Sequence, residues 1–227
     1  MRTFFLFYFL TYLLRNPLLA LLIAFAVVYL AEARHSGRFF NPGSFYSKRR
    51  TIHELERTLT INEHDAAARN DVGRLLVDEG RYAEARDHLA RAIQRMDDSA
   101  ETQYFYGIAL VKTGQAQEGI EHVLRALEIS PRFLYGEPQL ALARCHLEDG
   151  DAAQAEKRAG EAVKINTSSV EGWVIRGRAR ERLGDPTGAR DAWSSAVEAY
   201  DGLPRYLKMA ARKWRAQARR ALRSSRP

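Results

Sequence analysis

The chain has 227 residues, a formal net charge of +7 and a single cysteine, Cys145. This length suits one membrane segment plus one domain, and a lone thiol excludes an internal disulfide framework. Residues 1–50 carry +6 and residues 203–227 carry +9, which leaves −8 on the segment between them. The sequence therefore predicts an acidic central domain between two basic ends.

The first 34 residues are predicted to form a membrane segment. Residues 4–14 and 18–31 are apolar, and Asn16-Pro17 between them is typical of a helix start. The second run alone spans about 20 Å, short of a hydrocarbon core of about 30 Å. We therefore expect one transmembrane helix at about 16–34. One long kinked helix is the alternative, and residues 4–14 could equally span, re-enter or lie at the interface.

The distribution of charge around this span predicts its orientation. Five basic residues follow it closely, whereas two precede it: Arg34, Arg38, Lys48, Arg49 and Arg50 against Arg2 and Arg15. The positive-inside bias places the central domain in the cytoplasm, and a bacterial inner membrane is the expected location. A cleaved signal peptide is the alternative, because Ala31-Glu32-Ala33 resembles a cleavage site. Residues 35–50 are interpreted as a linker whose aromatic and basic side chains suit either the headgroup layer or a flexible tether.

The central domain repeats itself with a period of 34 residues. Gly73 corresponds to Gly107 and Gly80 to Gly114, and a slip of two residues separates the second unit from the third. In the unit 100–131, apolar residues at helical spacing occur on either side of a glycine turn. A fixed period of this length indicates stacked helix hairpins, because one hairpin cannot bury its own apolar face.

The periodicity sets the expected boundaries. A half-repeat capping helix is predicted within 51–65, and a basic C-terminal capping helix and tail at 204–227. The four full units are predicted at 66–99, 100–133, 136–169 and 170–203.

This pattern resembles the tetratricopeptide repeat (TPR) family. The family favours small residues where helices cross, an aromatic residue after the mid-unit glycine and a proline at the end of the unit. The matching residues include Gly73, Tyr82, Ala85, Gly107, Ala126, Pro131, Ala155, Gly177 and Trp193. The resemblance implies an all-α, right-handed solenoid with a concave groove that binds a protein or peptide partner.

The resemblance also implies which residues line the groove, since the first helix of each TPR unit faces inward. These positions are Asn70, Arg74, Tyr104, Ile108, Val111, Leu140, Arg144, Val174 and Arg178. Three arginines beside apolar residues predict a partner with carboxylates and apolar anchors. The family's carboxylate-clamp pattern for chaperone tails is matched only in part, at Asn70. We therefore expect a membrane-anchored adaptor or scaffold rather than a chaperone-tail receptor.

The C-terminal helix offers a second, basic surface. It comprises Arg212, Lys213, Arg215, Arg219 and Arg220. Its simplest role is that of a solvated cap, and the alternative function is an anionic-lipid or nucleic-acid surface binder. Nucleic acid is not the expected partner, and a homo-oligomer formed through the transmembrane helix is a third alternative. No motif predicts an enzyme, a cofactor or a metal site.

Overall fold

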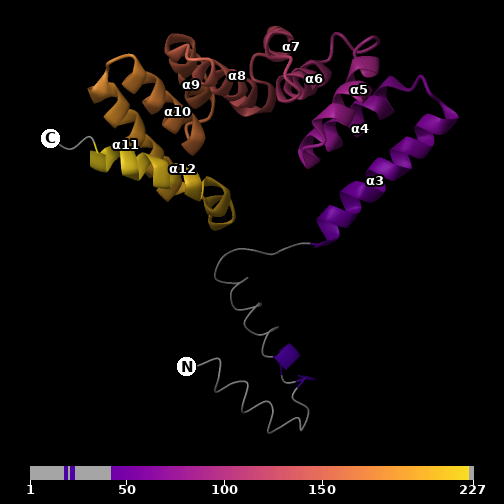
Figure 1. Ribbon diagram of the computed structural model, residues 1–227, viewed down its shortest axis with the longest axis horizontal. Coiled ribbons are helices and arrows are strands. Elements are labelled where there is room, and N and C mark those ends of the chain that lie inside the picture. Colours follow the sequence, from indigo (N-terminus) through magenta and orange to yellow (C-terminus); the bar gives the residue numbers. More distant parts are fainter. Residues whose placement is uncertain (1–17, 20, 24–41, 225–227) are drawn as a thin grey trace.

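The computed structural model describes residues 18–19, 21–23 and 42–224. From residue 42 onward the chain forms an arch of packed helices (Figure 1). The helices are α3 (Pro42–Ile61), α4 (Ala66–Glu79), α5 (Tyr82–Ala92), α6 (Ala100–Lys112), α7 (Ala116–Ile129), η1 (Phe133–Gly136), α8 (Glu137–Glu148), α9 (Ala152–Ile165), α10 (Val170–Arg182), α11 (Pro186–Gly202) and α12 (Arg205–Ser224).

Helix hairpins stack in sequence along the arch. The pairs α4/α5, α6/α7, α8/α9 and α10/α11 each fall within one of the predicted repeat ranges. Helix α12 packs on α11 and α10, in the place that the first helix of a further unit would take. In Figure 1 the first helix of each pair lies toward the hollow side of the arch and the second toward its outer side.

Local sequence signals begin and end these helices. Asp65, Ser99 and Ser169 precede α4, α6 and α10, and each side chain accepts a backbone N–H from the first turn. This N-cap contact satisfies a donor that has no partner within the helix. At the other end of α4, Gly80 adopts a left-handed φ of 78°, which turns the chain so that the N–H of Arg81 donates to the carbonyl of Leu76 at 2.9 Å.

Side chains in the first helices fasten each hairpin to the loop before it. Arg69 donates to the carbonyl of Glu63, and Gln103, one period later, donates to the carbonyl of Asp97 at 2.7 Å. The series continues with Gln139 to Pro131 and Trp173 to Thr167, both at 2.9 Å. The corresponding position in α12 is Leu207, which has no donor, so the series ends with the last full unit.

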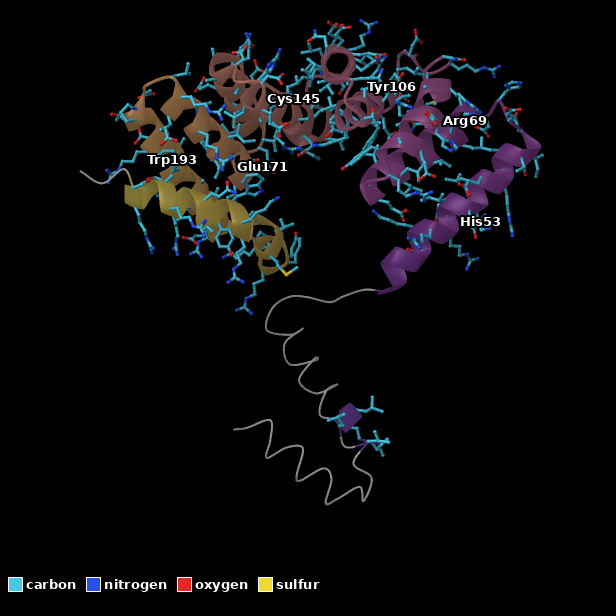
Figure 2. The ribbon with its side chains drawn as sticks, in the orientation of Figure 1. His53, Arg69, Tyr106, Cys145, Glu171 and Trp193 are labelled. Atoms are coloured by element: carbon cyan, nitrogen blue, oxygen red, sulfur yellow. The ribbon has the colours of Figure 1, made fainter. Side chains whose placement is uncertain are left out.

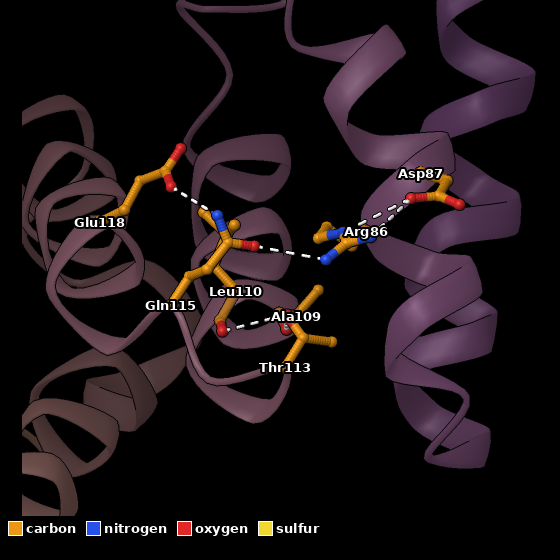
Figure 3. Close-up of polar contacts among 7 residues, drawn as sticks. All are labelled: Arg86, Asp87, Ala109, Leu110, Thr113, Gln115 and Glu118. Atoms are coloured by element: carbon orange, nitrogen blue, oxygen red, sulfur yellow. Dashed lines mark hydrogen bonds and ion pairs between the residues drawn. The ribbon is translucent and has the colours of Figure 1, made fainter.

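Polar contacts also join neighbouring hairpins at the surface (Figure 3). Arg86 of α5 donates to the Gln115 side chain at 3.3 Å, and Gln115 donates in turn to Glu118 at 3.0 Å. Arg86 also contacts its neighbour Asp87. These side chains are exposed, so each contact adds little stability by itself.

The connector between the second and third units absorbs the two-residue slip. It forms η1, in which Leu134 and Tyr135 adopt positive φ angles of 46° and 50°. Side-chained residues pay a steric cost in this region. Phe133 in the same turn packs its ring against Tyr104, with centroids 5.7 Å apart, which anchors the turn to α6.

The N-terminal cap differs from the sequence-based prediction. Residues 35–50 were expected to be a linker, but α3 begins at Pro42 and runs unbroken to Ile61. Proline is favoured in a first helical turn, and the Thr51 hydroxyl bonds to the Ser47 carbonyl one turn earlier, within the same helix. The boundary at residue 51 was therefore wrong.

The predicted membrane segment, residues 1–34 with a span at about 16–34, lies almost entirely outside the described residues. Within the residues that are described, no helix combines the length and the apolar character needed to cross a membrane.

Candidate partner-binding groove

The hollow side of the arch carries two columns of residues at matched positions of successive first helices. We call Arg74, Ile108, Arg144, Arg178 and Arg212 the inner column, because one comes from each of α4, α6, α8, α10 and α12. The second column begins the following helices and comprises Glu101, Glu137, Glu171 and Arg205. In the repeat register, each inner-column residue before the last thus corresponds to a charged second-column residue on the next first helix.

At two junctions these columns form ion pairs. Arg74 lies 3.3 Å from Glu101, and both side chains are about half exposed. Arg144 is held more tightly, because Glu137 lies 2.6 Å away in its own helix and Glu171 2.7 Å away in α10. Figure 2 labels Glu171 on the inner side of α10.

Burial sets the electrostatics of the Arg144 cluster. Burial alone would lower the pKa of the Arg144 guanidinium, but the carboxylates of Glu171 and Glu137 outweigh it and the pKa is raised. Burial raises the pKa of the Glu171 carboxyl, and Arg144 offsets this only in part. Arg144 is thus neutralised within the molecule and serves to join α8 to α10.

The last junction lacks this neutralisation. Arg178 of α10 is exposed, and the position that supplies glutamate at the earlier junctions is Arg205 in α12. Neither arginine makes an ion pair within the described part of the chain. The groove therefore ends in uncompensated positive charge.

Four of the predicted groove residues are buried in the packing between repeats. Asn70 accepts a hydrogen bond from the Thr102 hydroxyl at 3.0 Å, whereas Tyr104, Leu140 and Val174 belong to the apolar core. Burial also raises the pKa of the Tyr104 hydroxyl. Their side chains pack inside the solenoid, because the same helical face serves both the groove and the contact with the next unit.

The other five predicted positions reach the surface. Arg74 and Arg144 do so within their ion pairs, and Ile108 and Val111 of α6 are half-buried. Arg178 is exposed. The hollow side thus carries a half-buried apolar side chain on α6 and an exposed cation on α10, two first helices further along the arch.

The sequence analysis missed the acidic partners. Glu101, Glu137 and Glu171 recur with the same period as the glycines, so the repeat alignment contained the signal. The arginines were considered one at a time, whereas Arg74 and Arg144 each lie against a glutamate at the start of the next first helix.

The predicted basic surface of α12 divides into two parts. Arg215 is half-buried, because it pairs with Asp201 at 3.2 Å and lies over the Tyr200 ring. It packs against α11 and does not belong to the exposed part of the predicted basic surface. Lys213 lies 4.6 Å from the centroid of the Trp214 ring, whereas Arg212, Arg219 and Arg220 are exposed.

The remaining reactive side chains have structural surroundings. Burial raises the pKa of the Cys145 thiol, which opposes formation of the nucleophilic thiolate. The His122 ring is 2.7 Å from the Gln103 side chain and therefore belongs to the packing of α6 on α7. Within the described residues, no three histidine, cysteine or acidic side chains gather closely enough to hold a metal ion.

Stacked helix hairpins around a hollow inner face define a repeat solenoid, a class that presents extended concave binding surfaces. Models of the tetratricopeptide repeat match residues 76–132 and 140–204. An 80-residue stretch, 35% of this chain, is 32% identical to the TPR repeat-containing protein PA0015 of Pseudomonas aeruginosa and covers 71% of that protein. The chain belongs to the TPR family.

Solved structures share the fold. The crystal structure of MamA aligns with a TM-score of 0.61 over 66% of this chain and 86% of that one, at 19% identity. YrrB, described as a TPR protein with an unusual peptide-binding site, aligns at 0.59 over 75% and 86%, at 18% identity. TTC0263, a thermophilic TPR protein of Thermus thermophilus, aligns at 0.57 over 77% and 93%, at 17% identity.

Proposed function

We propose that this chain is a membrane-anchored TPR adaptor that holds a protein partner in its concave groove. The partner segment carries an acidic group and an apolar anchor, and its retention serves assembly of a membrane-associated complex. The observation that carries the proposal is Arg178, an exposed groove cation that the described part of the molecule leaves without a counter-charge.

The spacing of the groove features suits an extended peptide. The half-buried side chain of Ile108 lies on α6, and Arg178 lies on α10. Two steps between first helices, at about 8–10 Å each, separate them by roughly 20 Å. An extended chain covers this distance with about six residues. A partner segment would therefore need an apolar side chain and a carboxylate about six residues apart.

The anchor is supported by sequence composition. The apolar runs at 4–14 and 18–31 precede the arch directly, and basic residues follow them. A membrane span there would hold the groove at the cytoplasmic face of a bacterial inner membrane.

Site-specific photocrosslinking in native membranes tests the groove. A probe at Ile108 and a probe at Arg178 should each trap the same partner, whereas a probe at Lys157 on α9 should not. In a chain with the probe at Ile108, Arg178→Glu should abolish the adduct, because it places an anion opposite the partner's carboxylate.

Lys157→Glu is the matched control, since it makes the same charge change at an exposed residue of a second helix. Arg144→Glu is unsuitable because it would break the α8–α10 ion pairs. Adducts that differ between the two groove positions, or that survive Arg178→Glu, would contradict the proposal.

A further inference from the structure

The side of α12 that does not pack on the arch is mostly cationic, and it includes Arg205 and Arg212, the last residues of the two groove columns. Seven exposed residues share one side of the helix, spaced three or four positions apart except for the adjacent Arg219 and Arg220: Arg205, Met209, Arg212, Ala216, Arg219, Arg220 and Arg223. We call these residues the α12 outer face. Five of the seven are arginines, and α12 contains no acidic residue. The opposite side, which includes Trp214, Ala218 and Leu222, packs into the C-terminal core.

The five arginines have no counter-charge within the described part of the chain. Their side chains make no ion pair or hydrogen bond with another described residue, whereas Arg215 on the packed side is paired with Asp201. Arginines at i, i+4 and i, i+7 on one face repel one another. A capping helix needs a polar outer face for solubility, but it does not need one of a single sign.

Apolar side chains accompany the charge at the start of the helix. Tyr206 and Met209 are 75% and 46% exposed, and Met209 belongs to the α12 outer face itself. Cations with neighbouring aromatic and apolar side chains suit the headgroup layer of an anionic bilayer, which takes up both kinds of group. Nucleic acid would engage the arginines but offers less to Met209.

The position of α12 in the arch agrees with such a surface. The Pro42 end of α3 and helix α12 both lie at the same open edge of the arch in Figure 1. In Figure 2, side chains that end in nitrogen extend from α12 toward that edge. A membrane span that precedes α3 would bring the bilayer to this edge.

We propose that the α12 outer face docks on the anionic headgroups of the membrane in which the chain is anchored. The arch would then stand on two supports, the anchor at its N-terminal end and α12 at its C-terminal end. This inference rests on the proposed anchor for its geometry, but the lipid-binding chemistry of α12 does not depend on the groove partner.

The test uses the full chain reconstituted in vesicles. Cys145→Ser removes the native thiol, and Ala216→Cys carries a fluorophore at the centre of the outer face. Quenching by a lipid with a quencher in its headgroup reports contact. We expect quenching in vesicles that contain phosphatidylglycerol and little in pure phosphatidylcholine. It should weaken with salt, as the screening length falls from about 10 Å at 0.1 M to about 3 Å at 1 M.

Charge variants identify the residues. R212Q/R219Q/R220Q should weaken the docking equilibrium by about fivefold for each cation removed. R132Q/K157Q/K164Q is the control, because it removes the same charge from exposed residues of other elements and should leave quenching unchanged. Glutamine keeps the helix intact, which circular dichroism checks.

The outcomes separate the two proposals. If the chain stays with vesicles after an alkaline wash but the probe is not quenched, the docking is overturned and the anchor stands. If the wash removes the chain, the anchor fails. Docking then stands only if the unwashed chain floats with phosphatidylglycerol vesicles and R212Q/R219Q/R220Q abolishes this flotation. Quenching that is equal in both lipids, or a probe that responds to duplex DNA and not to phosphatidylglycerol, overturns the docking.

Discussion

Single small residues fix how closely the helices of a hairpin approach. Gly107 of α6 and Gly119 of α7 face each other, and a Cβ on either would lie 2.6 Å from the other's carbonyl oxygen. Gly160 of α9 is also inside a helix, but a Cβ there would meet only the Arg176 side chain, at 3.7 Å. Close backbone packing therefore requires glycine at 107 and 119, whereas nothing in the surroundings of residue 160 requires it.

Alanine substitution should separate these causes. Gly107→Ala should destabilise the protein by about 1–3 kcal/mol, because backbone atoms must move to admit the methyl group. Gly160→Ala should be neutral or stabilising by up to about 1 kcal/mol, since alanine favours the helix and the space is open. Urea unfolding measures both. Equal effects at the two sites would show that helix propensity, and not the crossing distance, decides the outcome.

Two half-buried histidines predict a loss of stability in mild acid. Burial lowers the pKa of His88, with Arg69 nearby adding to the effect, and burial also lowers the pKa of His122. The unfolded chain then binds protons more readily than the folded one, starting near the ordinary histidine pKa of about 6.5. The stability that neutral His88 and His122 contribute is therefore present above that pH and is lost as the pH falls through and below it.

The measurement is the unfolding free energy between neutral pH and about pH 5, the range in which histidines titrate. The native protein should lose stability more steeply than the H88Q/H122Q variant. The difference between the two curves isolates the histidines from carboxylates, which titrate at lower pH. Parallel curves would show that neither ring is desolvated enough to matter.

At the scale of elements, the sequence predicted helices better than it predicted their partners. The 34-residue period predicted the hairpins because glycine turns and apolar stripes are local signals. Asn70 and Tyr104 were expected in the groove but are buried, since one helical face meets both solvent and the next repeat. The start of α3 was also missed, because aromatic and basic residues with nearby glycines read as a linker although they remain compatible with a helix.

The Arg144 cluster should contribute more to the free energy of unfolding than its counterpart two hairpins earlier, the Arg74–Glu101 pair. Arg144→Met leaves Glu171, whose side chain is 20% exposed, and Glu137 without their cation. We expect the free energy of unfolding to fall by about 1–3 kcal/mol, which is less than the roughly 3–5 kcal/mol lost when one partner of a fully buried pair is removed. Arg74→Met breaks a more exposed pair and should cost at most about 1 kcal/mol.

A second substitution checks the cause. Glu171→Gln in the Arg144→Met background should recover part of the loss, because it removes the stranded negative charge. Thermal unfolding of the single and double variants gives the coupling. No recovery would indicate that Arg144 acts through its packing rather than its charge.

At the scale of the whole molecule, the arch is built from neighbours in sequence. Helices pack on the next one or two helices along the chain, and the two ends have separate cores. Stability in such a solenoid is a sum of units and of interfaces between them. A change at one end should therefore leave the other end largely unaffected.

Hydrogen exchange of a matched pair of variants tests this locality. Trp214→Ala removes an α12 side chain from the C-terminal core, and Leu59→Ala removes an α3 side chain from the N-terminal core. Each variant should lose about 2–3 kcal/mol of unfolding free energy. For Trp214 this is less than for a fully buried aromatic side chain, and for Leu59 it is at the low end of the range for leucine. Trp214→Ala should speed exchange in α10 and α11 but not in α4 and α5, and Leu59→Ala should do the reverse. If either variant speeds hydrogen exchange equally in all four of these helices, the arch unfolds as one unit. A substitution in the groove, the α12 outer face or a cap would then change the stability of the whole arch.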